Sequence, residues 1–225
     1  MSQRLIFADP HAAADVVTFA GRAARLGDTA VRLQGAGGTL VMTTAVLAPR
    51  TLVDATPTVL AMRMLPVDPE LVCDVAVEAT ALAISDDDPA SVSLPETAIA
   101  PAWAGIAPPR GGWASTGQIT AATLAARAQW GIAAVADGVP TDAGEDAVRA
   151  VRATVWGAAD DALHDLPLGV AFAAFALGFI AGDEAAGVFT SGQWTRVTLA
   201  RGHVLVRGPI AQGLTPVRRT GGAQL

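Results

Sequence analysis

Residues 166–182 read LPLGVAFAAFALGFIAG, seventeen residues without a charged side chain. The proline near the start suits the first turn of a helix. Phe172, Phe175 and Phe179 then follow at helical spacing and form one bulky stripe. We therefore predict a helix over residues 167–181 that is apolar around nearly its whole circumference. Such a helix must be covered on every side by the rest of the chain or by a second subunit.

A strip of small residues accompanies the aromatic stripe and includes Ala173. The spacing Gly178-x-x-x-Gly182 would allow another helix to approach closely. We predict that Phe172, Phe175, Phe179 and Ala173 form the structural centre of the chain and an interface for self-association, with a homodimer as the simplest form.

The same stretch lies at the lower edge of the roughly 17–25 residues needed to cross a bilayer. Acidic residues flank both ends, Asp165 on one side and Asp183 on the other, and no Arg stands nearby as an anchor. We predict a buried helix and no membrane partner.

Two further helices are expected before it. Ser115 and Gln118 match a capping box, which predicts a helix from residue 115 to about 136 with Trp130 on its inward face. A second helix is expected from Asp142, with Val148 and the next apolar residues at helical spacing facing inward.

Alternating residues follow at 194–199 and 203–207 and predict a hairpin. Three helices and a hairpin resemble a winged helix, in which residues 168–181 would be the recognition helix. That segment has no Arg, Lys, Asn, Gln or Ser with which to read a base or a phosphate. A degenerate winged-helix regulator is therefore kept only as an alternative.

In the first part of the chain, the sequence predicts one helix followed by several strands. Residues 10–26 have helical periodicity, whereas 30–34, 39–44 and 59–65 are typical of strands. Gly35-Ala36-Gly37-Gly38 joins two strands, which favours a hairpin turn over a phosphate-binding loop.

Because strands and helices are segregated along the chain, the fold class is expected to be α+β. The expected parts are a helix with an antiparallel sheet (1–85), a Pro-rich crossing segment that is packed down by two Trp residues (86–114), a helical half with the C-terminal hairpin (115–214) and a disordered tail (215–225).

The composition excludes several kinds of chemistry. The chain contains no Lys, Tyr or Asn, all 15 basic residues are Arg, and 49 residues are Ala. This composition resembles that of proteins from high-GC actinobacteria. Without Lys there is no Schiff base and no P-loop lysine, and without Asn no kinase-type metal ligand.

Charge and cysteine content set further limits. A net charge of −6 argues against nucleic acid as a partner. A single Cys, Cys73, excludes an intrachain disulfide, which agrees with a reducing compartment. The start of the chain does not match a signal peptide, so we expect a cytoplasmic protein.

One acidic cluster is a weak candidate for a metal site. On a helix, Asp160 and His164 would lie one turn apart, as would Asp161 and Asp165. A solvated helix end explains the same pattern, and the other two His residues lie far away in the sequence. We predict no metal and no cofactor.

No catalytic pattern is found, so an enzyme is the less favoured class. The first hypothesis is a cytoplasmic protein that acts through protein contacts, including contacts with itself. The first alternative is a small-molecule-binding or enzymatic α+β domain with a pocket between its two halves, and the second is the winged-helix regulator.

Overall fold

The computed structural model describes residues 4–26, 29–51 and 53–208. The disordered tail predicted for residues 215–225 lies outside the described residues. The helices are α1 (Pro10–Ala23), α2 (Ala121–Gly138), α3 (Glu145–Gly157) and α4 (Gly169–Ala176), with short 3-10 turns η1 (Ala79–Ala81), η2 (Ala102–Gly105) and η3 (Asp161–Leu163). The strands are β1 (Arg4–Ile6), β2 (Ala30–Ala36), β3 (Thr39–Leu47), β4 (Thr58–Pro66), β5 (Cys73–Glu78), β6 (Ala83–Ser85), β7 (Asp88–Ser93), β8 (Ala114–Thr120), β9 (Ala159–Asp160), β10 (Leu166–Pro167), β11 (Ala185–Ser191), β12 (Trp194–Leu199) and β13 (Gly202–Arg207).

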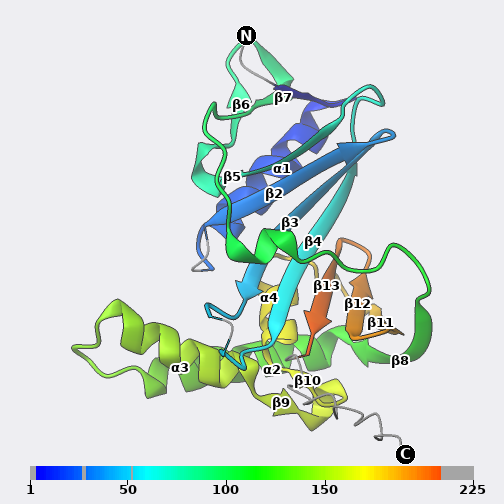
Figure 1. Ribbon diagram of the computed structural model, residues 1–225. Coiled ribbons are helices and arrows are strands. Elements are labelled where there is room, and N and C mark those ends of the chain that lie inside the picture. Colours follow the sequence, from blue (N-terminus) through cyan, green and yellow to red (C-terminus); the bar gives the residue numbers. More distant parts are fainter. Residues whose placement is uncertain (1–3, 27–28, 52, 209–225) are drawn as a thin grey trace, which may run out of the picture.

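An antiparallel eight-stranded sheet organises the molecule, in the order β5-β2-β3-β4-β13-β12-β11-β8 (Figure 1). The fold is therefore mixed α+β, a sheet with four helices. Both halves begin with a strand and a helix; the first half then adds β2 to β5 to this sheet, and the second adds β11 to β13 after α3 and α4. The two halves meet where β4 pairs with β13, with Leu60 opposite Leu205.

The larger core lies between one face of this sheet and the helices. Helix α1 begins at Pro10 because the Asp9 carboxylate caps it, accepting from the Ala12 amide at 3.0 Å. Val16 and Phe19 lie on its buried face, and Phe19 stacks on Phe179 with ring centroids 6.3 Å apart. The two halves of the chain therefore share one core.

The opposite face of the sheet is crossed by the strap, which we define as residues 95–113. Figure 1 shows it running across the front of the strands from β7 to β8. Trp103 on η2 is buried and packs with Leu60 and Leu205, which point to this side of the sheet. The expectation that the Pro-rich segment is packed down is confirmed at Trp103, because strand residues alternate between the two faces and give the strap its own small core.

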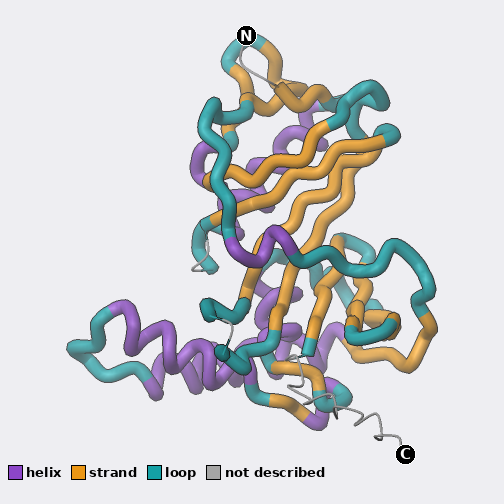
Figure 2. Tube along the Cα trace, viewed as in Figure 1, coloured by secondary structure: helices purple, strands orange, loops and turns teal. Residues whose placement is uncertain are grey.

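Helices α2 and α3 form a pair whose tip extends away from the sheet (Figure 2). Of the residues of α3, only Trp156, near the C-terminal end, is fully buried. This end packs onto α4, where the Trp156 and Phe172 rings stack with centroids 4.3 Å apart. The pair is consequently anchored at its base and exposed over much of its length.

Several sequence predictions are confirmed. Helix α1 lies within the predicted 10–26, and β2, β3 and β4 cover the predicted strands. Gly37 and Gly38 both have positive φ, 56° and 77°, which is the backbone of a tight hairpin turn. The glycine-rich segment is therefore a strand connection.

The predicted start of the helix at Ser115 is wrong. Residues 114–120 form β8, which pairs with β11, and α2 begins only after Thr120. The Thr120 hydroxyl caps it by accepting from the Thr123 amide at 3.0 Å. Ser115 and Thr120 are both possible N-caps in the sequence. Because residues 114–120 pair with β11, the helix begins after Thr120.

The predicted helix over residues 167–181 is also wrong in extent. Helix α4 has eight residues and ends at Ala176, since Gly178 adopts φ +69°. The winged-helix arrangement is not confirmed: the predicted hairpin lies inside the eight-stranded sheet, and most of α4 is buried against that sheet. Among the described helices, none is long and apolar enough to cross a membrane.

Candidate interaction site on the helical side

Exposed apolar side chains gather on two helices. Among the described residues, seven large apolar side chains are exposed, and three of them lie on α2 and α4: Trp130 (54%), Ile132 (41%) and Phe175 (40%). An aromatic ring left in solvent costs free energy unless a partner covers it, so such residues mark candidate contact surfaces.

The rotation of α2 explains why Trp130 points outward. The buried residues of α2 are Ala121, Leu124, Ala128 and Gly131. Gly131 sits directly against Trp156, since a Cβ built there would lie 2.2 Å from that ring. With Gly131 facing the core, the preceding residue, Trp130, points outward, and its predicted inward position is wrong.

The outer face of α2 is nearly free of charge. Arg127 and Asp137 are the only charged residues of this helix. The exposed positions are Ala122, Ala126, Gln129, Trp130, Ile132, Ala133, Ala136, Asp137 and Gly138. A partner that covers this face would have little charge to desolvate.

A cleft of about 360 Å³ lies beside Trp130, between α2 and the segment that follows α3. At its base the Arg127 guanidinium binds the Asp160 carboxylate, with Nε 2.7 Å from Oδ2. The Asp160 side chain is 6% exposed. Arg127 also lies over the Trp130 ring, 4.6 Å from its centroid, so it fixes both neighbours.

The structure separates the predicted metal candidates. Residues 159–167 form a tight hairpin with a 3-10 turn and not a helix, so the expected one-turn spacing does not occur. Asp160 binds Arg127, the Asp161 carboxylate accepts from the Ala162 amide at 2.9 Å, and a ring nitrogen of His164 lies 3.1 Å from the Gln118 carbonyl oxygen. Asp161 and Asp165 stay exposed on the rim of the cleft. No three metal-ligating side chains cluster among the described residues.

The residues predicted as interface or core are also separated. Ala173 and Phe179 are fully buried, and Phe179 lies beyond the end of α4. Phe172 is half-buried under Arg152, whose Cζ lies 5.9 Å from the ring centroid. Phe175 alone is exposed, so the three Phe residues do not form one stripe.

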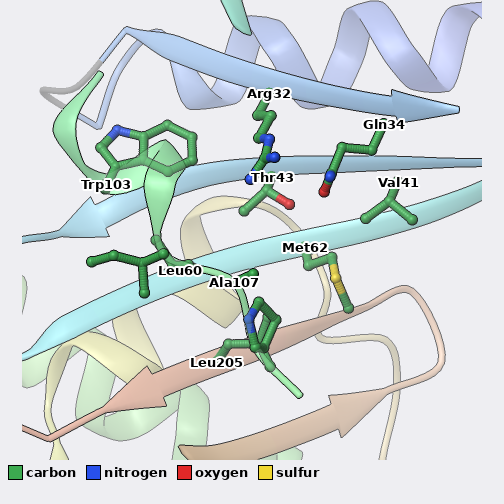
Figure 3. Close-up of a pocket in the computed structure, with 11 residues that line it drawn as sticks. Arg32, Gln34, Val41, Thr43, Leu60, Met62, Trp103, Ala107 and Leu205 are labelled. Carbon is green, nitrogen blue, oxygen red and sulfur yellow. The ribbon is translucent and has the colours of Figure 1, made fainter. Parts of the chain in front are cut away.

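A second, smaller cavity of about 40 Å³ lies between the strap and the sheet (Figure 3). Arg32 holds the strap there by donating to the Ala104 carbonyl at 2.5 Å while pairing with both carboxylate oxygens of Asp74 at 2.8 Å. The hydrogen bond from Arg32 lowers the pKa of Asp74. The volume of this cavity is far below that of an ordinary ligand site, and the contacts of Arg32 hold the strap against the sheet here.

His203 lies on the strap side of the sheet, among Arg196, Thr198 and Met62. Its Nδ1 is 3.1 Å from the Thr198 hydroxyl. Burial, followed by the positive charge of Arg196, lowers the pKa of His203 below its usual 6.5. Arg196 cannot move away easily, because its guanidinium lies over the Trp113 ring of the strap, 4.6 Å from the centroid.

We expect acid to destabilise the protein through His203. Because the folded pKa is lowered, the unfolded chain binds the proton first, so stability falls as the pH decreases below 6.5. Urea unfolding at about pH 7.5 and about pH 5.5 should show a smaller pH-dependent loss for His203→Gln than for the wild type. His11→Gln, an exposed position on α1, is the matched control. Equal losses in the wild type and His203→Gln would contradict this prediction.

Sequence reasoning missed Arg127 and Trp130 as members of one site. A signal was available, since Arg127 is the only basic residue of an Ala-rich helix and stands three residues before Trp130. The sequence does not indicate that Asp160 is the partner of Arg127, because 33 residues separate the two in the chain.

Comparisons with known proteins divide the chain at the strap. Residues 1–105 match the model of a "Domain of unknown function (DUF8010)", and residues 108–211 match that of a "Domain of unknown function (DUF8185)". No curated protein matches the chain.

Among solved structures, the chain is similar to a DNA polymerase sliding clamp from Caulobacter crescentus, with 11% identity, 100% of this chain and 70% of that chain covered, and a TM-score of 0.48. A second structure, titled Caulobacter crescentus pol III beta, has 10% identity, covers 99% of this chain and 70% of that chain, and gives a TM-score of 0.46.

Proposed function

We propose that this protein works through protein–protein contacts, and that its partner on the helical side is a second copy of itself. The observation that carries the proposal is the exposed, nearly uncharged outer face of α2, with Trp130 at its middle and Phe175 on the adjoining α4. We propose a cytoplasmic location and no nucleic-acid partner, in keeping with the net charge of −6.

A second copy is the favoured partner because the charges on the outer face of α2 are compatible with those on an identical face. In a twofold interface the same residues meet one another, so like charges at its centre would repel. Between Arg127 and Asp137 the face has no charge, and an antiparallel crossing of two α2 helices would place Arg127 of one copy toward Asp137 of the other. Trp130 would lie near the crossing point, where contact residues contribute most to affinity.

The test is the oligomeric state. We expect the wild type to sediment as a dimer at micromolar concentration and Trp130→Asp to sediment as a folded monomer, because a buried unpaired carboxylate opposes association. Val72→Asp is the matched control, since Val72 is 83% exposed and directly precedes β5, at the opposite edge of the sheet from β8, the strand that leads into α2. It should leave the dimer intact.

A monomeric wild type at the highest soluble concentration would overturn the proposal. Equal effects of Trp130→Asp and Val72→Asp would do the same, because the loss would then not be specific to α2. Circular dichroism of each variant confirms that the change is in association and not in folding.

A small-molecule-binding or enzymatic role is the second candidate. The cleft beside Trp130 favours it, since its volume of about 360 Å³ falls at the lower end of ligand sites. The winged-helix alternative is not favoured by any contact, because α4 presents mostly buried residues. The division of the chain into residues 1–85, 86–114 and 115–214 stays part of the proposal.

A further inference from the structure

Arg196 on β12 carries a positive charge that no carboxylate in the described part of the chain neutralises. Its Cζ lies 4.6 Å from the centroid of the Trp113 ring and 5.1 Å from that of the Phe189 ring. Stacking of this kind uses the faces of the guanidinium group and leaves the N–H groups at its edge for hydrogen bonds. Among the residues that the structure describes, Arg196 has no hydrogen-bond acceptor, and its Nε atom is buried. The guanidinium is therefore held in place and lacks an anion.

Two further basic side chains flank Arg196 from the neighbouring strand, β13. Arg196 lies opposite Leu205, which packs under the strap. His203 and Arg207 stand two residues to either side of Leu205, so they lie on the same face of the sheet. Diagonal neighbours of this kind lie about 7–8 Å apart in an antiparallel sheet. Two guanidinium groups and an imidazole therefore gather on the strap side of β12 and β13.

The strands around these residues carry no acidic side chain to balance them. The neighbouring strands β4, β13, β12, β11 and β8 contain no Asp or Glu, and neither do residues 97–113 of the strap. Arg110 is exposed on the strap, next to Pro109, whose carbonyl accepts from Trp113 Nε1 at 3.2 Å. We call Arg110, Arg196, Arg207 and His203 the basic face. In a chain with a net charge of −6, such a local excess of positive charge favours an acidic partner.

The geometry of the basic face suits an extended peptide. The cavity under the strap, about 40 Å³, is too small for an ordinary organic ligand, and Arg196 does not line it. Alternate residues of an extended strand lie on one side, about 6.6–6.8 Å apart. That spacing is close to the diagonal separation of Arg196 and Arg207. Carboxylates at alternate positions of a peptide can therefore pair with both arginines, whereas the net charge of −6 disfavours a nucleic acid.

We propose that the basic face binds an acidic, extended segment of a partner protein. One carboxylate pairs with the edge of the Arg196 guanidinium, the next alternate carboxylate pairs with Arg207, and Arg110 attracts the segment from the strap. The helices cover the other face of the sheet, so this segment can bind while the outer face of α2 contacts a second copy. The inference goes beyond the self-association proposed above and does not rest on it.

Peptide binding to the full-length chain tests this. The probe is a short fluorescein-labelled peptide of alternating Glu and Ser, and fluorescence anisotropy at about 50 mM salt measures its dissociation constant. We expect Arg196→Gln to raise that constant about tenfold or more, because a charge-assisted hydrogen bond is lost, and Arg207→Gln to raise it as well. Arg25→Gln is the matched control, because it removes the same charge from an exposed position just after α1, on the helical side. It should leave the constant unchanged.

Two further probes identify what the basic face recognises. The same peptide with Gln in place of Glu should not bind the wild type, and a labelled single-stranded oligonucleotide should bind more weakly than the Glu peptide. Tighter binding of the oligonucleotide would overturn the proposal, because the partner would then be a nucleic acid. Equal constants for the wild type and Arg196→Gln/Arg207→Gln would also overturn it. Circular dichroism checks that each variant folds, and Arg110→Gln, at an exposed position, provides the test if Arg196→Gln does not fold.

Discussion

Replacing Phe179 with Ala is expected to lower the free energy of unfolding by about 3–5 kcal/mol. Phe179 is fully buried, stacks on Phe19 of α1 and fills the space over Gly202 of β13, where a Cβ would lie 2.6 Å from its ring. One side chain thus joins the first helix, the segment after α4 and the centre of the sheet. The cavity left behind would be lined by rigid elements that cannot collapse.

Phe175→Ala is the matched control for that measurement. The same atoms are removed four residues earlier, but Phe175 is 40% exposed, so we expect a smaller loss of about 1–2 kcal/mol. Urea unfolding followed by fluorescence would measure both. Equal losses would contradict the packing described for α4 and the residues after it.

Replacing Arg127 with Met is expected to cost about 3–5 kcal/mol, because it leaves the Asp160 carboxylate buried without its cation. Part of this loss should return in the double variant Arg127→Met/Asp160→Asn, which removes the stranded charge. The difference between the single and double variants, measured by urea unfolding, isolates the cost of that charge.

Arg149→Met is the control for the loss of an arginine. Arg149 lies on α3 and binds Asp146 at 2.8 Å, but the Asp146 side chain is 94% exposed. Exposed pairs contribute little, so the change should be under about 1 kcal/mol. A loss as large as that of Arg127→Met would mean that burial of Asp160 is not the cause.

The parts of the fold that follow from the sequence are those set by local backbone chemistry. Asp9 and Pro10 start α1, and the consecutive glycines Gly37 and Gly38 turn β2 into β3, because each residue type suits its backbone conformation. For residues 115–120, the local pattern predicted a helix, but these residues form part of β8. Their strand exists only because β11, which lies more than 60 residues later, pairs with them.

The candidate site was less accessible to prediction, for the same kind of reason. A helical wheel places Trp130 among apolar neighbours, which favours an inward position. The choice of face depends on Gly131, whose missing side chain admits the Trp156 ring from α3. The residues from Asp160 to Asp165 suggested a helix, but Asp160 accepts from the Ala162 amide and closes a 3-10 turn. Trp156 lies 25 residues after Gly131, and Asp160 is also held by Arg127, which lies 33 residues before it in the chain.

The pairing of β4 with β13 constrains how the chain must be made. Met62 lies opposite His203, so these neighbours in the sheet are 141 positions apart in the order of synthesis. While the ribosome completes the second half, β4 has an open edge with a largely apolar sequence, TVLAMRMLP, that can pair with any other nascent chain. The sheet is completed only when β13 pairs with β4, and pairing between strands so far apart in the sequence slows folding. We therefore expect chains that end before β13 to aggregate more readily than the full chain, because β4 then lacks its neighbour in the sheet.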